Sequence, residues 1–181
     1  MTPQTLEGNM VDVLAHGPRQ STDNKYLTFQ LAGEEFGIEI LKVREIIKVV
    51  DITAVPQMPS FMKGVVNLRG KVTPIVDMRL KFGMPEAEHT AQTCIIVVNV
   101  GTEIGIVVDT VSEVLDIPGE NIAPAPSIGR DIDSSFILGM GKVGEEVKIL
   151  LEIDQVLNAD QLSELLTSAT SVEASSTHSR G

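Results

Sequence analysis

The sequence predicts an all-β (mainly β) fold in which two pseudo-symmetric units pack on one hydrophobic core. Apolar residues make up 43% of the 181 residues, aromatic residues only 3%, and Trp is absent, so the core must be aliphatic. Val, Ile and Leu supply most of it, and β-branched residues favour strands. Apolar and polar residues alternate around Gly-containing turns, which is typical of β-hairpins. The same strand pattern also occurs twice along the chain, which indicates a duplicated unit.

The first strands are expected shortly after a polar N-terminal segment. Residues 1–24 are mixed and polar, so we expect a flexible arm there. From Tyr26 onward, the segment YLTFQLAGEEFGIEI predicts two strands around the turn Ala32-Gly33-Glu34. The ordered domain therefore starts at about residue 25.

The internal repeat begins at Cys94, where CIIVVNVGTEIGIVV has the same pattern in register. Gly33 corresponds to Gly101, and further along Gly64 corresponds to Gly139. Each copy has about 60 residues, a length at which a lone β-barrel buries too little surface to be comfortably stable. We therefore expect the two copies to pack face to face in one domain. The expected bounds are 25–158 for the domain, about 26–85 for the first barrel and about 93–157 for the second.

The central segment from Gly64 to Met78, GVVNLRGKVTPIVDM, predicts a further hairpin with an unusual turn. Gly70 can bend the turn through a positive φ, and Arg69 carries a cation on it. An Arg held on a rigid hairpin is a suitable docking residue, although an ordinary solvated turn residue or a structural partner of a carboxylate would have the same pattern. The second copy has Gly144 in place of Arg69, so the scaffold is repeated and the Arg turn is not.

The C-terminal segment predicts one short amphipathic helix followed by a disordered tail over 159–181. Asn158 and Asp160 are candidate helix caps, and Leu162, Leu165 and Leu166 follow at helical spacing.

Charge and composition exclude several classes of function. Asp and Glu number 25 against 14 Lys and Arg, a net charge of −11 that repels phosphate backbones, so nucleic acid is not an expected partner. The single Cys94 excludes an internal disulfide and fits a reducing compartment. No apolar run reaches the roughly 18 residues of a membrane span, so we expect a cytoplasmic protein without direct membrane insertion.

No catalytic, metal or cofactor site is expected. The three His residues are not at ligand spacing with one another or with Cys. Gly139-Met140-Gly141-Lys142-Val143-Gly144 matches the nucleotide motif GxGxxG, but a β-rich run follows it where a dinucleotide fold requires a helix. We interpret these glycines as a turn and a close strand approach. A small-ligand-binding or enzymatic β-barrel of unknown substrate remains the alternative, because a site assembled from distant loops escapes such a search.

An apolar cluster surrounds two prolines ahead of the central hairpin. Its members are Ile52, Val55, Met58, Phe61 and Met62. Either they pack inside the first barrel, or they form the exposed apolar patch that a protein-binding module needs.

Several of these segments together resemble the CheW family of bacterial chemotaxis coupling proteins. They are FGIEILKVREII, the Pro56-Gln57-Met58-Pro59 loop, MKGVVNLRGKVTPIVDMRLKF and IGIVVDTVSEVLDIP. The resemblance covers about Lys25 to Asn158 and is specific, because the NLRG turn and the duplicated Gly-Ile hairpins occur in the same order and spacing. The resemblance implies two five-stranded, SH3-like barrels on a shared core and no enzymatic activity.

The resemblance also implies partners and contact residues. It implies a non-catalytic adaptor that joins the cytoplasmic tips of chemoreceptors to the regulatory, CheW-like domain of the histidine kinase CheA, in signalling arrays at the membrane. A scaffold that builds arrays without transmitting a signal would share the same residues. The receptor contacts implied are Arg69, Glu45, Val43, Gly64, Asn67 and Leu68, with Glu45 and Arg69 as an ion pair. The kinase contacts implied are Ile52, Val55, Met58 and Phe61.

Overall fold

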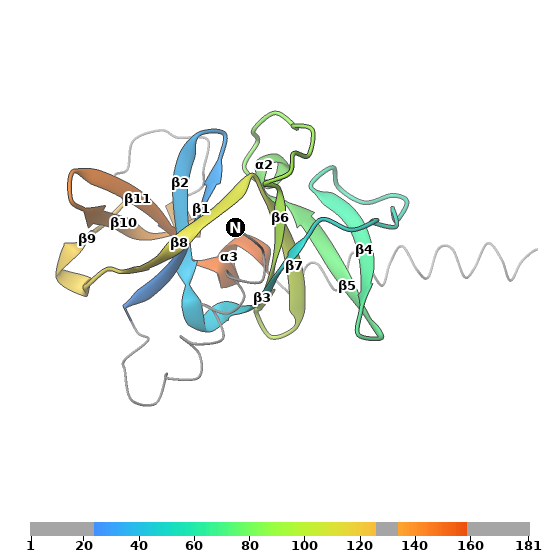
Figure 1. Cartoon of the computed structure of the whole chain (residues 1–181), viewed down its shortest axis with the longest axis horizontal. Coiled ribbons are helices and arrows are strands. Elements are labelled where there is room, and N and C mark those ends of the chain that lie inside the picture. The colour runs from blue at the N-terminus through green and yellow to red at the C-terminus, as the bar shows by residue number, and fades with distance from the viewer. Residues whose placement is uncertain (1–23, 126–133, 159–181) are drawn as a thin grey trace, which may run out of the picture.

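Two β-sheets lie side by side in the computed structural model, which describes residues 24–125 and 134–158 (Figure 1). The strands are β1 (Lys25–Leu31), β2 (Glu34–Glu39), β3 (Val43–Lys48), β4 (Met62–Leu68), β5 (Lys71–Asp77), β6 (Cys94–Asn99), β7 (Glu103–Val108), β8 (Thr110–Asp116), β9 (Ile122–Ala123), β10 (Ile137–Val143) and β11 (Glu146–Leu151). The helical elements are η1 (Ile40–Lys42), α2 (Met78–Lys81), η2 (Gly119–Asn121), η3 (Ser134–Phe136) and α3 (Ile153–Leu157). The predicted all-β fold is confirmed.

Each sheet combines strands from both sequence copies. One sheet has the order β8-β1-β2-β11-β10-β9 and the other the order β3-β6-β7-β5-β4. The first hairpin of each copy has therefore joined the later strands of the other copy, through the parallel pairs β2–β11 and β5–β7. In hydrogen-bond order neither sheet closes on itself within the described residues.

The sheets therefore do not follow the expected division into 26–85 and 93–157. The reason lies in the connections, because η1 carries the chain from β2 in one sheet directly to β3 in the other instead of turning it back. At the equivalent place in the second copy, Asp109 separates β7 from β8 in the same way.

The shared core lies between the two sheets. Phe36 of β2 stacks between Phe29 and Phe82 at ring-centroid distances of 6.0 and 5.8 Å, and Phe82 contacts Phe136 at 6.2 Å. Each sheet also encloses a smaller apolar cluster of its own. In β6, Ile95 faces the smaller cluster and Ile96 the shared core. Both faces of β6 are thus covered, which explains its continuous apolar run.

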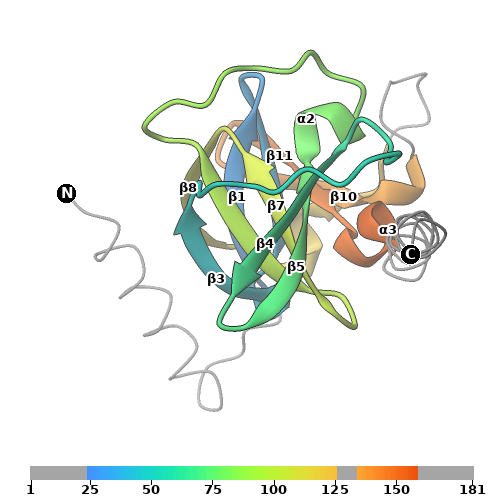
Figure 2. The same cartoon turned by 90° about the vertical axis from the view of Figure 1, so that its right-hand side faces the viewer.

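Two one-turn helices were not expected from the sequence. The central hairpin was expected to run to Met78, but β5 ends at Asp77, whose side chain accepts a hydrogen bond from Leu80 N (3.2 Å) and caps α2. At the equivalent place in the second copy, α3 packs on the shared core and ends at Asn158, which has a φ of 46°. Figure 2 shows α2 and α3 beside the sheets.

Both chain ends fall largely outside the described residues. The expected arm over 1–24 and the expected helix and tail over 159–181 therefore stay predictions. Among the described helices, none has the length and apolar character needed to cross a membrane.

Candidate docking surface around Arg69

The β4–β5 turn holds Arg69 in a tight, defined geometry. Both Arg69 and Gly70 have positive φ, 53° and 83°, as a two-residue turn that matches the strand twist requires. The side chain of Asn67 accepts a hydrogen bond from Gly70 N at 2.8 Å. The expected positive φ of Gly70 is confirmed, and that of Arg69 was not foreseen. Asn67 therefore shapes the turn, while Arg69 projects from it with 59% of its side chain exposed.

The expected ion pair between Glu45 and Arg69 is present. Arg69 Nη1 donates a hydrogen bond to Glu45 Oε2 of β3, the strand at the opposite edge of the same sheet in hydrogen-bond order. This hydrogen bond, together with the charge of Glu45, raises the pKa of Arg69 further above its usual value. The guanidinium is thus charged at every physiological pH and has donors left for a partner.

The pair belongs to a network of four alternating charges. Glu103, at the start of β7, accepts a hydrogen bond from Arg44 Nε at 3.2 Å, and its other oxygen lies 3.7 Å from Arg69 Nη2. The β4–β5 and β6–β7 turns lie at the same end of the sheet in both views (Figures 1 and 2). Sequence reasoning missed Glu103, because only the exchange of hairpins between copies brings a second-copy residue beside Arg69. It also missed Arg44, which joins the network through Glu103. We call Glu45, Asn67, Leu68 and Arg69 the Arg69 surface.

Two of the expected receptor residues do not lie on this exposed surface. Val43 is only 3% exposed and belongs to the shared core. Gly64 is buried, and a Cβ built on it would lie 2.0 Å from the carbonyl oxygen of Thr53. Leu68 is half-buried and packs on the apolar cluster of its own sheet. Val43 therefore faces the shared core, and Gly64 adjoins the segment that contains Thr53.

The residues expected to contact the kinase lie on residues 49–61, which we call the strap. Thr53 pairs with Val65 of β4 through two backbone hydrogen bonds of 2.9 Å. Ile52, Val55, Met58 and Phe61 are all half-buried. Ile52 packs on the cluster of its own sheet, and Met58 and Phe61 on the shared core. The strap is thus anchored while each apolar side chain keeps an exposed part.

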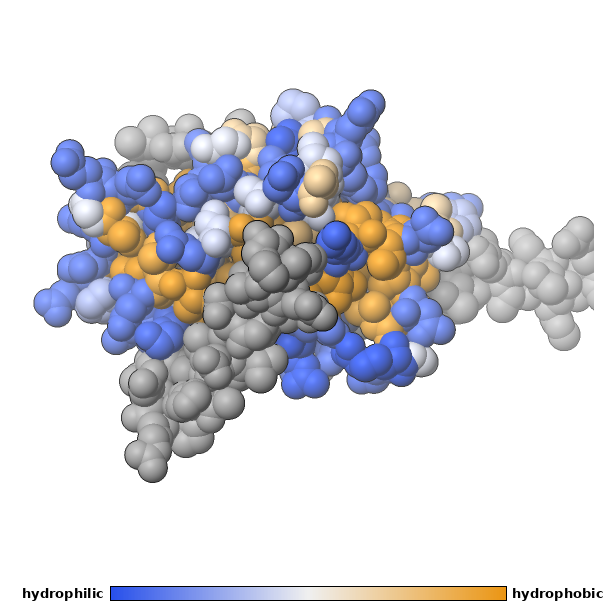
Figure 3. All heavy atoms as spheres, viewed as in Figure 1, coloured by the Kyte–Doolittle hydropathy of each residue, from blue (hydrophilic) through white to orange (hydrophobic). Residues whose placement is uncertain are grey.

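Apolar surface remains visible on the molecule. Figure 3 shows hydrophobic residues over both sheets, framed by polar ones. Over residues 24–125 and 134–158, the exposed large hydrophobic residues are Leu41, Val50, Val72, Leu138 and Val147. Such a mixture is what a protein-binding surface requires.

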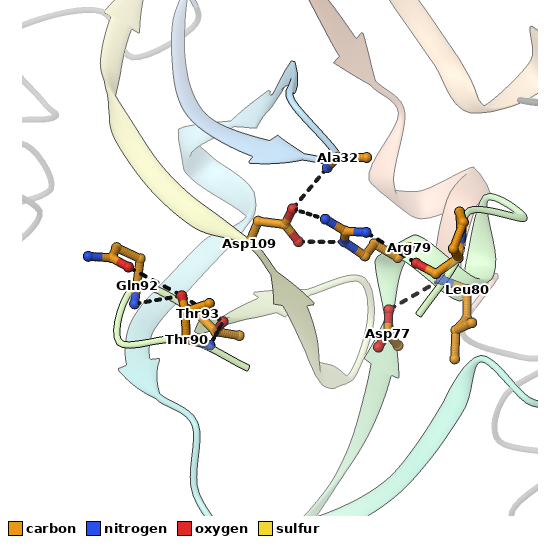
Figure 4. Close-up of polar contacts among 9 residues, drawn as sticks. Ala32, Asp77, Arg79, Leu80, Thr90, Gln92, Thr93 and Asp109 are labelled. Atoms are coloured by element: carbon orange, nitrogen blue, oxygen red, sulfur yellow. Dashed lines mark hydrogen bonds and ion pairs between the residues drawn. The ribbon is translucent and has the colours of Figure 1, made fainter. Parts of the chain in front are cut away.

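A second ion pair, also missed from the sequence, ties distant parts of the chain together (Figure 4). Arg79 holds Asp109 through two hydrogen bonds, Nε to Oδ1 at 2.8 Å and Nη2 to Oδ2 at 2.6 Å. Asp109 also accepts from Ala32 N at 2.9 Å in the β1–β2 turn. The hydrogen bond from Arg79 holds the pKa of Asp109 below its usual value. Asp109 is therefore held by both Arg79 and the backbone of Ala32.

Two features of the described residues bear on a metal site and on the nucleotide motif. Over 24–125 and 134–158, no group of His, Cys, Asp and Glu is arranged to hold a metal ion. Gly139 and Gly141 lie within β10 and Gly144 in the β10–β11 turn with a φ of 62°. A Cβ on Gly139 would lie 2.5 Å from Ile122, so this glycine allows a close strand approach, as expected.

The fold defines a β-rich scaffold that carries an exposed Arg on a tight hairpin. Comparison with known proteins agrees, since the model of the CheW-like domain matches residues 25–161. Chemotaxis protein CheW of Klebsiella aerogenes is 39% identical over 145 residues, which cover 80% of this chain and 87% of that protein. Probable chemotaxis protein CheW of Rhizobium etli is 36% identical, with 75% and 88% covered. The crystal structure of scaffolding protein TtCheW from Thermoanaerobacter tengcongensis has a TM-score of 0.70 and 34% identity, covering 75% of this chain and 92% of that one.

The chain belongs to the CheW-like domain family, a family of chemotaxis scaffold proteins.

Proposed function

We propose that this protein is a non-catalytic adaptor that couples the cytoplasmic tips of chemoreceptors to the histidine kinase CheA. The observation that carries the proposal is Arg69, an exposed cation fixed on a tight hairpin by an ion pair. An anchor that is already ordered loses less side-chain entropy when a partner docks. The receptor tip would contact the Arg69 surface, and the buried Val43 and Gly64 would affect that contact only through the packing of β3 and β4. The protein would act in the cytoplasm, at membrane-associated arrays.

The kinase contact is proposed on the strap. The half-buried side chains of Ile52, Val55, Met58 and Phe61 keep apolar area outward while their backbone is tied to β4. The regulatory domain of CheA would dock here, so one molecule would use two separate surfaces for its two partners.

The test is a titration of the protein with a receptor-tip fragment and with the regulatory domain of CheA, first separately and then together. Arg69→Ala is expected to weaken receptor binding by roughly 5- to 150-fold, as an interface Arg anchor does, and to leave kinase-domain binding unchanged. Val55→Asp is expected to do the reverse, with Val147→Asp on the exposed second-copy hairpin as its control. Failure of the wild-type protein to bind either partner would refute the proposal.

A further measurement distinguishes an adaptor that couples receptor to kinase from a scaffold that only assembles the array. In reconstituted arrays, an adaptor makes kinase activity depend on receptor state, whereas a passive scaffold supports assembly without changing that activity. Within the Arg69 surface, Glu45→Ala should reproduce much of the loss of receptor binding that Arg69→Ala causes. The double mutant should lose clearly less receptor-binding free energy than the sum of the two single mutants, because either substitution alone already breaks the pair.

A further inference from the structure

Glu103 occupies an unusual place beside the Arg69 surface. Its side chain is only 15% exposed, yet it lies between two guanidinium groups, those of Arg44 and Arg69. Arg44 Nε donates to Glu103 Oε2, whereas Oε1 is buried and has no hydrogen-bond partner among the described residues. A buried carboxylate oxygen without a donor is unfavourable, so this position needs a compensating interaction.

Arg69 brings a cation close to that oxygen. Nη2 lies 3.7 Å from Glu103 Oε1, which is ion-pair distance but longer than a hydrogen bond. Glu45 holds the same guanidinium through Nη1 alone. One hydrogen bond leaves a guanidinium able to rotate, and a second carboxylate on another nitrogen fixes its plane.

We propose that Glu103 is a positioning residue of the Arg69 surface, holding the plane of the Arg69 guanidinium while Arg44 holds Glu103. The inference rests on the proposed receptor binding, which it deepens. The docking surface then depends on both sequence copies, because Glu103 comes from the second copy while Arg44, Glu45 and Arg69 come from the first. When a partner covers the site, exclusion of water strengthens the attraction between Arg69 and Glu103.

The first test needs no partner. In the full-length protein, ¹⁵N NMR of the Arg69 Nε–H group reports how fast the guanidinium rotates. Glu103→Gln, which keeps the shape and removes the charge, should speed this rotation severalfold. Glu145→Gln, on the exposed turn of the second-copy hairpin, makes the same change in net charge and should leave the rotation as in the wild type. Unchanged rotation in Glu103→Gln would overturn the proposal.

The second test measures affinity for a receptor-tip fragment. Glu103→Gln should weaken binding severalfold, Glu103→Asp should weaken it less, and Glu145→Gln should not weaken it. In an Arg69→Ala background the effect of Glu103→Gln should vanish, because a positioning residue acts only through the group it positions. Equal losses in both backgrounds would show that Glu103 contacts the receptor by itself and would overturn the proposal, as would no loss at all.

Two further controls keep the outcomes distinct. The side chain of Arg44 is 55% exposed. Arg44→Gln should speed the rotation of the Arg69 guanidinium less than Glu103→Gln does, and it tests the network while Glu103 itself stays unchanged. If Glu103→Gln unfolds at a lower temperature than the wild type, Arg44→Gln decides in its place. If the wild-type protein binds no receptor fragment, the proposed function fails, and the NMR measurement alone still decides whether Glu103 positions Arg69.

Discussion

Gly64 is expected to be the most sensitive glycine of the described chain, because it lets the strap approach β4. Its φ is 143°, and an added Cβ would lie 2.0 Å from Thr53 O and 2.7 Å from Thr53 C, which are backbone atoms that cannot rotate away. In Gly64→Ala the strap must move, and two backbone hydrogen bonds between Thr53 and Val65 are lost at about 1 kcal/mol each. The unfavourable φ adds about 1–3 kcal/mol.

The reduced entropy of the unfolded chain offsets these losses by about 0.4–1 kcal/mol. The net loss in the free energy of unfolding is then about 2–5 kcal/mol, a fall in melting temperature on the order of 10 °C for a domain of this size. Gly144→Ala is the matched control, because its φ is also positive, 62°, while a Cβ there meets nothing within 4 Å. It should lose only about 1 kcal/mol.

Thermal unfolding followed by circular dichroism measures the two variants, and hydrogen exchange of the Thr53 and Val65 amides reports on the strap directly. Both amides should exchange faster in Gly64→Ala and at the wild-type rate in Gly144→Ala. The steric reasoning is refuted if Gly64→Ala melts within a few degrees of Gly144→Ala with both amides still protected. Binding of the kinase regulatory domain should weaken along with the strap.

Three further predictions concern the ion pairs, the core and the second copy. Asp109→Asn should lower the free energy of unfolding by about 1–2 kcal/mol at pH 7, a value reduced because the pair is partly exposed. In urea unfolding, this difference from the wild type should shrink as the pH falls below about 4. The sign follows from the lowered pKa of Asp109, because its stabilisation exists only while the carboxylate is charged and is lost on protonation in acid; an equal difference at pH 7 and pH 3 would contradict it. Phe36→Ala, at a fully buried ring between Phe29 and Phe82, should cost about 3–5 kcal/mol by chemical denaturation, whereas truncation of the exposed Val147 should cost less than about 0.5 kcal/mol. Substituting Lys142 or Glu145, which flank the repeat partner of Arg69, should change receptor affinity by no more than roughly twofold in a binding titration, and a large loss would mean that the second copy docks too.

The features that depend on a single hairpin could be predicted from the sequence. The turns at Ala32-Gly33 and at Arg69-Gly70 both have two consecutive positive φ angles, and each lies between strands that alternate in the sequence. Local turn chemistry and the period of two were therefore enough to predict these hairpins and the position of Arg69. The internal repeat also predicted correctly that the strand pattern recurs, since β1 to β5 of the first copy correspond to β6, β7, β8, β10 and β11 of the second.

The exchange of hairpins was not predictable in this way. The apolar pattern of β6 indicates that both its faces are buried but does not say which strands will pair with its edges. The first hairpin of either copy could pair with the same strands, because the two copies share nearly the same pattern of apolar and turn residues. Contacts that depend on the exchange, such as Glu103 with Arg69, could not be predicted for the same reason.

The parallel strand pairs between the copies, β2–β11 and β5–β7, affect how the chain folds. Phe36 of β2 pairs with Ile149 of β11, so the first hairpin finds its partner only when nearly the whole domain has been synthesised. Contacts of such long sequence separation make folding slow, since a large loop must close before they form. On the ribosome, the nascent first copy would expose the strand edges of β2 and β5 until the later strands emerge, and unpaired strand edges favour aggregation during that interval.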